Sequence, residues 1–162
     1  MVRHTDRRLA EIEALYRDRF PYFAQVARAI VGDRERAAEA VQDAFVGVIR
    51  TRDSFRADGP LEAWVWRAVV NSARKATRRP LVQVGEEQDI EYELPELVAS
   101  FAPFVSSLPE RQRLVVFLRY YADLDYRTIA AILDVEVGTV SATLASAHAT
   151  LRKKLRKVEA DA

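Results

Sequence analysis

The chain has 162 residues, of which 49% are hydrophobic and 30% charged, a composition typical of a globular protein of one or two domains. It has no cysteine and two histidines, which excludes a disulfide framework and a cysteine nucleophile and leaves little for a zinc site. The net charge of +1 conceals an asymmetry, since residues 1–80 carry 16 basic and 11 acidic groups, residues 81–102 carry six acidic groups alone, and residues 103–162 carry nine basic and seven acidic groups.

Such a segregation of charge hints at contact with nucleic acid. No apolar run approaches the ~20 residues that span a bilayer, and the N-terminus lacks the apolar core of a signal peptide. We therefore expect a cytoplasmic protein without membrane contact. Side chains with catalytic chemistry are scattered without a partnered base, so we expect no enzyme, no cofactor and no metal site.

Amphipathic helical patterns fill most of residues 1–80. Apolar side chains recur every three to four residues in three stretches, which predicts three helices that close a small core. Pro21 is expected to kink or split the first helix, and Gly32 with Asp33 predicts its end and the N-cap of the second. The three stripes are Leu9, Ile12, Leu15, Phe20, Phe23, Val26 and Ile30; Ala37, Val41, Ala44, Phe45, Val48 and Ile49; and Leu61, Trp64, Val65, Ala68, Val69 and Ala73.

Residues 81–102 interrupt this pattern. They show no sustained period and only acidic charge, so we interpret them as an acidic linker that its own repulsion keeps extended. After Pro103 the pattern is helical again, and residues 125–133 and 139–155 form two helical stretches with a tight connection between them. This arrangement predicts a helix-turn-helix, although any helical hairpin shares the spacing. The predicted fold class is all-α, with two small helical domains.

The second helix of this hairpin would be the recognition helix, and its first half is poor in charge. Base edges are read by Arg, Lys, Asn or Gln, and phosphates are held by Lys or Arg. The late basic cluster is either a solvated helix end that complements the helix dipole or a patch that faces phosphates. The first half offers Ser141, Thr143, Ser146 and His148, and the basic cluster is Arg152, Lys153, Lys154, Arg156 and Lys157.

Two tryptophans lie on the predicted helix that follows Pro60. Trp64 is on the apolar stripe and is expected in the core, whereas Trp66 is off it. An aromatic ring among cations suits single-stranded DNA, because bases stack on the ring and cations follow the phosphates. The alternative is that Trp66 packs against a neighbouring domain. The polar neighbours of Trp66 on this helix are Arg67, Asn71, Arg74 and Lys75.

The outward face of the second predicted helix is mixed in polarity. It carries Val46 and Gly47 where solvent would favour charge. The face is therefore either solvated or a docking surface for a helix of another protein. Its polar members are Glu39, Gln42, Asp43 and Arg50.

Four segments together resemble the extracytoplasmic-function (group IV) sigma factors of bacteria. Residues 33–45 resemble the family's D-x-x-x-A-E-D-L-V-Q-E-x-F stretch, and residues 64–71 resemble its W-L-x-x-I-A-x-N helix. Residues 118–130 resemble L-R-Y followed by L-S-Y-x-E-I-A, and residues 137–140 match V-G-T-V. Each segment is weak alone, but four in order at the right spacing are specific, and the resemblance covers residues 9–157.

The resemblance implies a transcription initiation factor with a sigma region 2 domain over residues 1–80, a linker over 81–102 and a sigma region 4 domain over 103–162. Region 2 would dock on the clamp of core RNA polymerase through Glu39, Gln42, Asp43, Val46 and Arg50. It would capture the non-template strand of the −10 element through Phe55, Arg56, Trp66, Arg67, Asn71, Arg74, Lys75, Arg78 and Arg79. Region 4 would contact the −35 element through Arg127, Thr139, Ser141, Thr143, Ser146, His148 and Arg152.

The family's recognition helix usually carries several basic side chains that this chain lacks. Because each lost phosphate contact lowers affinity, we expect weak −35 binding. The resemblance also implies a protein that is monomeric when free. Members of the family are often held inactive by an anti-sigma factor, which makes one a candidate partner here. Two alternatives stay open: a stand-alone helix-turn-helix regulator, which would normally be a dimer, and a sigma-like interaction module with weak DNA binding.

Overall fold

The computed structural model describes residues 4–78, 103–105 and 107–162, and these divide between two compact units, Met1–Glu87 (unit 1) and Gln88–Ala162 (unit 2). The described residues form helices and turns and no strand, which confirms the all-α prediction. The predicted acidic linker, residues 81–102, lies outside the described residues. The domain boundaries on either side of it remain a prediction.

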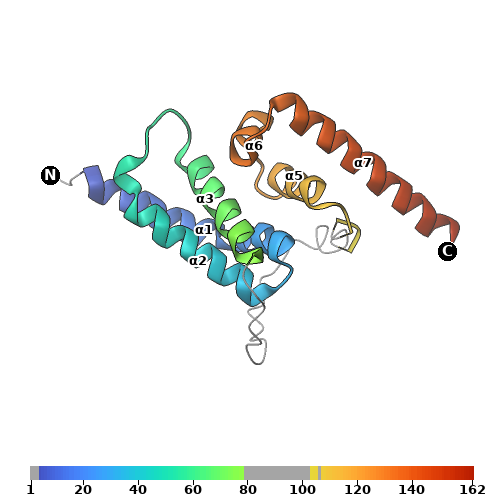
Figure 1. The fold of residues 1–162 in the computed structure, drawn as a ribbon, viewed down its shortest axis with the longest axis horizontal. Helices are drawn as coiled ribbons and strands as arrows, with labels where there is room; N and C mark the ends of the chain where they lie inside the picture. The colour runs from blue at the N-terminus through green and yellow to red at the C-terminus, as the bar shows by residue number, and fades with distance from the viewer. Residues whose placement is uncertain (1–3, 79–102, 106) are drawn as a thin grey trace. The chain divides into compact units, whose positions relative to one another are not determined.

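Three helices make up the described part of unit 1: α1 (His4–Val31), α2 (Arg34–Arg50) and α3 (Leu61–Thr77), with a short 3-10 turn, η1 (Arg52–Ser54), after α2 (Figure 1). Helix α1 runs through Pro21 without a break, so the predicted split of this helix is wrong. A proline inside a helix costs about 3 kcal/mol. Burial of Phe23 and Val26 just beyond Pro21 offsets this cost.

The connection between α1 and α2 is confirmed as predicted. Gly32 takes a φ of +83°, a left-handed conformation that glycine adopts without a steric penalty. Asp33 then caps α2, and its carboxylate accepts a hydrogen bond from the backbone N–H of Arg36 at 2.9 Å. A guanidinium N–H of Arg36 in turn donates to the carbonyl oxygen of Ala76, which ties the start of α2 to the end of α3.

Aromatic rings fill the core of unit 1. Phe23 lies 4.3 Å from Trp66 and 5.3 Å from Phe45 between ring centroids. Trp66 is fully buried, so its predicted exposure is wrong. Trp64, which the apolar stripe placed in the core, is only half-buried. Helix α3 packs against both α1 and α2, and its buried face is therefore wider than a single stripe and includes Trp66 and Val70.

Unit 2 contains α5 (Glu110–Tyr120), α6 (Tyr126–Leu133) and α7 (Val137–Ala160). Asp125 caps α6 by accepting the N–H of Thr128 at 2.8 Å. Asp134 ends α6 in a left-handed conformation with φ +54°, and α7 then leaves at 101° to α6. The predicted helix-turn-helix is confirmed, since α6 and α7 are joined by three residues and share the buried side chains Ile129, Leu133, Val140 and Leu144.

No single helix among the described residues is long and apolar enough to cross a membrane. Taken together, the bent pair of α6 and α7 is long and apolar enough, by length and composition only.

Candidate polymerase and nucleic-acid interfaces

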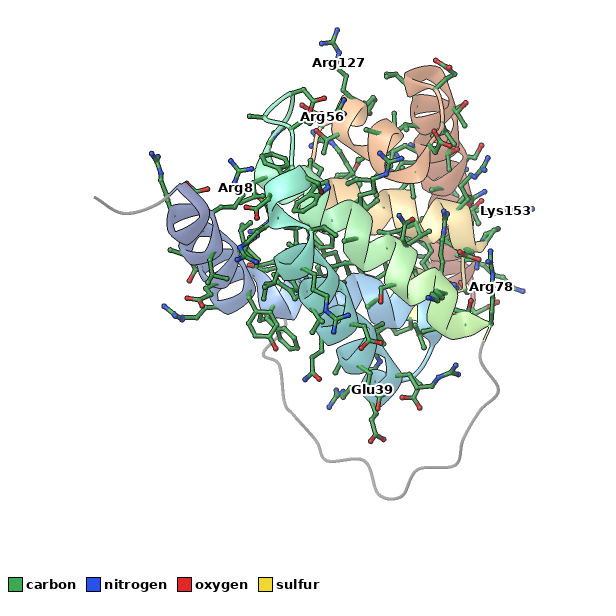
Figure 2. The ribbon with its side chains drawn as sticks, turned by 60° about the vertical axis from the view of Figure 1, so that its left-hand side comes forward. Arg8, Glu39, Arg56, Arg78, Arg127 and Lys153 are labelled. Atoms are coloured by element: carbon green, nitrogen blue, oxygen red, sulfur yellow. The ribbon has the colours of Figure 1, made fainter. Side chains whose placement is uncertain are left out.

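A ridge of exposed side chains runs along the outward face of α2. Glu39, Gln42, Asp43, Val46 and Arg50, the five residues predicted to bind polymerase, are all exposed. Successive members of this set are three, one, three and four residues apart, which places all five on one stripe of the helix. Figure 2 shows Glu39 directed away from the other helices of unit 1. The ridge is thus free for a partner, and its one large apolar member, Val46, is 47% exposed.

An apolar groove of about 730 Å³ lies on one side of this ridge, between α1 and α2. Tyr16, Phe20 and Phe45 line it, and the ring centroids of Tyr16 and Phe45 are 4.9 Å apart. Gln42 and Val46 of the ridge line it as well. A partner helix laid on the ridge would therefore meet apolar surface next to charged side chains, which is the arrangement typical of helix docking.

A second groove, of about 630 Å³, lies on the other side of the ridge, between α2 and α3. Its α2 wall includes Asp43, Val46 and Arg50, and its α3 wall includes residues predicted to bind DNA. Those α3 residues are Arg67, Asn71 and Lys75, all exposed. The structure thus brings the predicted polymerase-binding and DNA-binding residues to two walls of one groove.

Trp64, and not Trp66, is the tryptophan on this groove. Trp66 is sealed in the core, where its indole N–H donates to Oε1 of Glu62 at 3.4 Å, so its ring is not open to a base. Trp64 lies three residues before Arg67 and seven before Asn71, and it lines the groove with both. Sequence reasoning missed it, although the apolar Val70 four residues after Trp66 indicated that Trp66 faces the core.

The other residues predicted to bind the −10 strand are distributed around α3. Arg74 is half-buried, and Arg78 is exposed at the C-terminal end of α3, where Figure 2 shows it. Arg79 lies outside the described residues. Arg56 is exposed on the connection from η1 to α3, residues 55–60, which we call the α2–α3 loop.

Phe55, at the start of the α2–α3 loop, is half-buried between two side chains. Its ring centroid lies 5.3 Å from that of Trp64, and the guanidinium carbon of Arg8 lies 4.6 Å from it. The Phe55 ring is therefore held by an aromatic neighbour, Trp64, and a cationic one, Arg8. The first loop side chain that is exposed to solvent is therefore Arg56.

In unit 2, the predicted DNA-binding residues differ in exposure. Arg127, Ser141, Ser146 and Arg152 are exposed, and Figure 2 shows Arg127 projecting from α6. Thr139 and Thr143 are half-buried. His148 is half-buried too, and its Nε2 forms a hydrogen bond with the Tyr120 hydroxyl of α5 at 2.8 Å.

The outward face of the first four turns of α7 consists of small residues. The residues that point directly away from the buried Val140, Leu144 and Ala147 are Gly138, Ala142, Ala145 and Ala149, all exposed. None of them has a hydrogen-bonding side chain that could read a base edge. Positive charge is exposed only farther along the helix, at Arg152, Lys153, Arg156 and Lys157.

Two titratable groups of unit 2 have shifted pKa values. Hydrogen bonds from Thr128, first from its side chain and then from its backbone, hold the pKa of the Asp125 carboxyl below its usual value. Burial raises the pKa of Tyr121 to about 12. The shift of Asp125 thus reflects the N-cap of α6, and that of Tyr121 reflects burial at the end of α5.

Comparisons with known proteins identify both units. Residues 15–80 match the family model of sigma-70 region 2, and residues 104–156 match that of sigma-70 region 4. The chain is 30% identical to the ECF RNA polymerase sigma-E factor of Escherichia coli K12, with 73% of each protein covered. It is 27% identical to the RNA polymerase sigma-H factor of Pseudomonas aeruginosa, over 78% of this chain and 76% of that protein.

Two solved structures share the fold. CnrH in complex with the cytosolic domain of CnrY matches 90% of this chain and 88% of its own, with a TM-score of 0.69 and 24% identity. The sigma factor RpoE of Bartonella quintana, in complex with the anti-sigma factor NepR, matches 90% of this chain and 97% of its own, with a TM-score of 0.72 and 19% identity.

Proposed function

This chain belongs to the extracytoplasmic-function sigma factors, which are transcription initiation factors. We propose that the two grooves of unit 1 have different partners. The ridge of α2 with the apolar groove beside it binds core RNA polymerase. The groove between α2 and α3 receives the −10 strand. The observation that carries this proposal is that Asp43, Val46 and Arg50 face Arg67, Asn71 and Lys75 across one groove.

The α3 wall has the chemistry that captures a single strand. Bases stack on an aromatic ring such as that of Trp64, and cations such as Arg67 and Lys75 follow the phosphates. Asn71 supplies both a donor and an acceptor for the edge of an unstacked base. Binding the strand only when it is unpaired favours the melted promoter, because the energy of stacking on the protein replaces that lost from the duplex.

Region 4 contributes less sequence recognition in this proposal. The exposed basic side chains in the second half of α7, together with Arg127 of α6, hold phosphates near the −35 element. The small outward residues at the start of α7 read few base edges. This face is the one observation that favours the second candidate, a sigma-like interaction module with weak DNA binding.

We further propose a cytoplasmic protein that catalyses no reaction of its own and has a protein inhibitor. The solved relative of Bartonella quintana is bound to an anti-sigma factor, which supports an anti-sigma factor as a partner here. Such a partner would compete with polymerase if it covered the α2 ridge. We expect the free chain to be monomeric.

Transcription by a reconstituted holoenzyme tests the function. The purified chain is mixed with bacterial core RNA polymerase, co-elution is measured, and transcript starts are mapped on genomic fragments. Shared sequences upstream of the starts would give the promoter elements. Co-elution without transcripts would favour the interaction module, and absence of co-elution would overturn the proposal.

Two exposed valines provide a matched test of the ridge. Val46→Asp places a charge between the two grooves, whereas Val158→Asp makes the same change at a 52% exposed valine near the end of α7. We expect Val46→Asp to weaken polymerase binding at least about tenfold, which corresponds to ~1.4 kcal/mol, and Val158→Asp to leave it unchanged. Equal effects of the two variants would exclude the ridge as the docking surface.

A further inference from the structure

The α2–α3 loop joins unit 1 at both ends, through Phe55 after η1 and through Pro60, the N-cap of α3. The backbone of Phe55 leaves the 3-10 turn in an extended conformation, with φ −62° and ψ 119°. The next five residues, 56–60, are all exposed. The contacts of Phe55 therefore hold the end of the loop that follows η1.

Arg8, from the first turns of α1, holds Phe55 in two ways. Its guanidinium carbon lies 4.6 Å from the centroid of the Phe55 ring, and its Nη1 donates a hydrogen bond to the Phe55 carbonyl oxygen at 3.3 Å. Arg8 and Phe55 are 47 residues apart in the sequence. Figure 2 shows Arg8 and Arg56 at the same end of unit 1. One side chain thus fixes both the ring and the backbone where the loop begins.

We propose that Arg8 is a positioning residue for strand capture, which holds the α2–α3 loop beside Trp64 without itself binding DNA. This inference rests on the proposed function of α3 and the loop. A guanidinium is planar and can stack on a ring while its N–H groups donate in the ring's vicinity, whereas a lysine ammonium is a point charge that does not do both. The position therefore requires arginine and not merely a positive charge.

Arg7 is a matched control one residue away. It pairs with Glu11 at 3.3 Å, and the two side chains are 76% and 47% exposed. The pair lies on the solvent side of α1 and has no contact with the loop among the interactions of the described residues. Arg7→Ala removes the same charge from the same turn of the helix as Arg8→Ala.

The contact itself is tested without DNA or polymerase. In a Trp66→Phe background, Trp64 is the one tryptophan left of the two in the chain. Its quenching by acrylamide then reports how well the loop and Phe55 cover it. We expect Arg8→Ala and Arg8→Lys to increase quenching and Arg7→Ala to leave it unchanged, with circular dichroism confirming that each variant folds. Unchanged quenching in both Arg8 variants would overturn the proposal.

The functional test uses the full chain with core polymerase on a promoter found by start-site mapping. Permanganate reactivity of unpaired thymines measures opening, and competition with labelled wild-type chain measures polymerase affinity. We expect Arg8→Ala and Arg8→Lys to lose opening by about 3- to 30-fold, the range that a lost cation–π contact gives, with polymerase affinity unchanged. Arg7→Ala should open the promoter normally.

Two outcomes would contradict positioning. If Arg8→Lys opens the promoter as well as wild type while Arg8→Ala does not, Arg8 acts through its charge on DNA. If Arg8→Ala loses as much opening in a Phe55→Ala background as in wild type, the two residues are not coupled. A wild-type chain that binds polymerase but starts no transcripts would instead overturn the proposed function, and the quenching result would still decide whether Arg8 holds the loop.

Discussion

Helices α3 and α7 are alike on their inner faces and different on their outer ones. Both bury aliphatic side chains at helical spacing, Val65 and Val69 in α3 and Val140 and Leu144 in α7. Outward, α3 presents a ring, cations and an amide along one groove. The first four turns of α7 present glycine, alanine and serine. The inner faces specify the fold that both units share with the family, and the outer faces decide what each unit binds.

This difference indicates how the work of promoter recognition is divided between the units. A unit with stacking and phosphate-binding side chains gains affinity from a melted strand. A unit with a small-residue helix and a distant basic cluster gains affinity from duplex phosphates, with little sequence information. We therefore expect the −10 element to contribute more to promoter choice by this chain than the −35 element.

The largest expected effect separates the inner and outer tryptophans of α3. Trp66→Ala removes a fully buried ring that contacts Phe23, and we expect it to lower the free energy of unfolding by about 3–5 kcal/mol. Trp64→Ala removes a half-buried ring and should cost about 1 kcal/mol while weakening strand capture. Urea unfolding followed by circular dichroism measures both. Equal losses of stability would show that both rings belong to the core.

The fold was largely predictable because apolar periodicity and capping are local. The N-cap aspartates Asp33 and Asp125 precede the helices that they cap. The stripe of α2 buries its predicted residues except Ile49, which is half-buried, and the helix-turn-helix buries Ile129, Leu133, Val140 and Leu144. Of the two effects predicted for Pro21, a kink or a split, the split is wrong, because a local rule on proline takes no account of the tertiary burial on either side of it.

The site was only partly predictable, for two physical reasons. The α2 ridge follows from spacing alone, because its five residues lie on one face of one helix. The exchange of Trp64 and Trp66 arose because α3 packs on two helices, and its buried arc is wider than one stripe. The contact of Arg8 with Phe55 joins residues 47 apart, and no periodicity within either segment indicates it.

The next prediction compares the outer faces directly through their salt dependence. Arg67→Ala and Lys75→Ala should each lower the salt slope of single-strand binding by the holoenzyme by about 0.7, because each removes one phosphate contact. Ser141→Ala and Ser146→Ala in α7 should leave the slope of duplex binding unchanged. Binding of fluorescent promoter fragments across a salt series measures both.

One gain-of-contact variant sharpens the same comparison. Ala145→Arg adds a cation to the small outward face of α7, and we expect it to raise the slope for duplex DNA by about 0.9. A slope that does not change would place this face away from DNA. A loss of affinity in Ser141→Ala or Ser146→Ala as large as that in Arg67→Ala would instead contradict the division of work between the units.

The two N-cap aspartates, Asp33 and Asp125, allow the stabilisation from helix capping to be compared between the two units. Asp33→Ala and Asp125→Ala each leave backbone N–H groups without an acceptor, and we expect each to cost about 1 kcal/mol of stability. The folded pKa of Asp125 is lowered, so its stabilisation is complete above the unfolded pKa and disappears as the pH falls below about 4. Acid titration of unfolding should therefore be shallower in Asp125→Ala. A titration curve parallel to that of wild type would mean that the cap hydrogen bond does not form in solution.

The smallest expected effect compares inner and outer tyrosines within unit 2. Burial raises the pKa of Tyr121 to about 12. Its ring centroid lies 4.7 Å from that of Phe117, whereas the adjacent Tyr120 is 57% exposed. Because the folded pKa is above the unfolded value of about 10, the stabilisation from Tyr121 is complete below that pH and is lost as the pH rises through about 12. The ring is half exposed, and solvent reduces the effect to less than ~1 kcal/mol. Tyr121→Phe should make stability depend less on pH in the alkaline range, and Tyr120→Phe should not. The reason is that deprotonation of Tyr121 places a charge on a ring that is packed in the folded state.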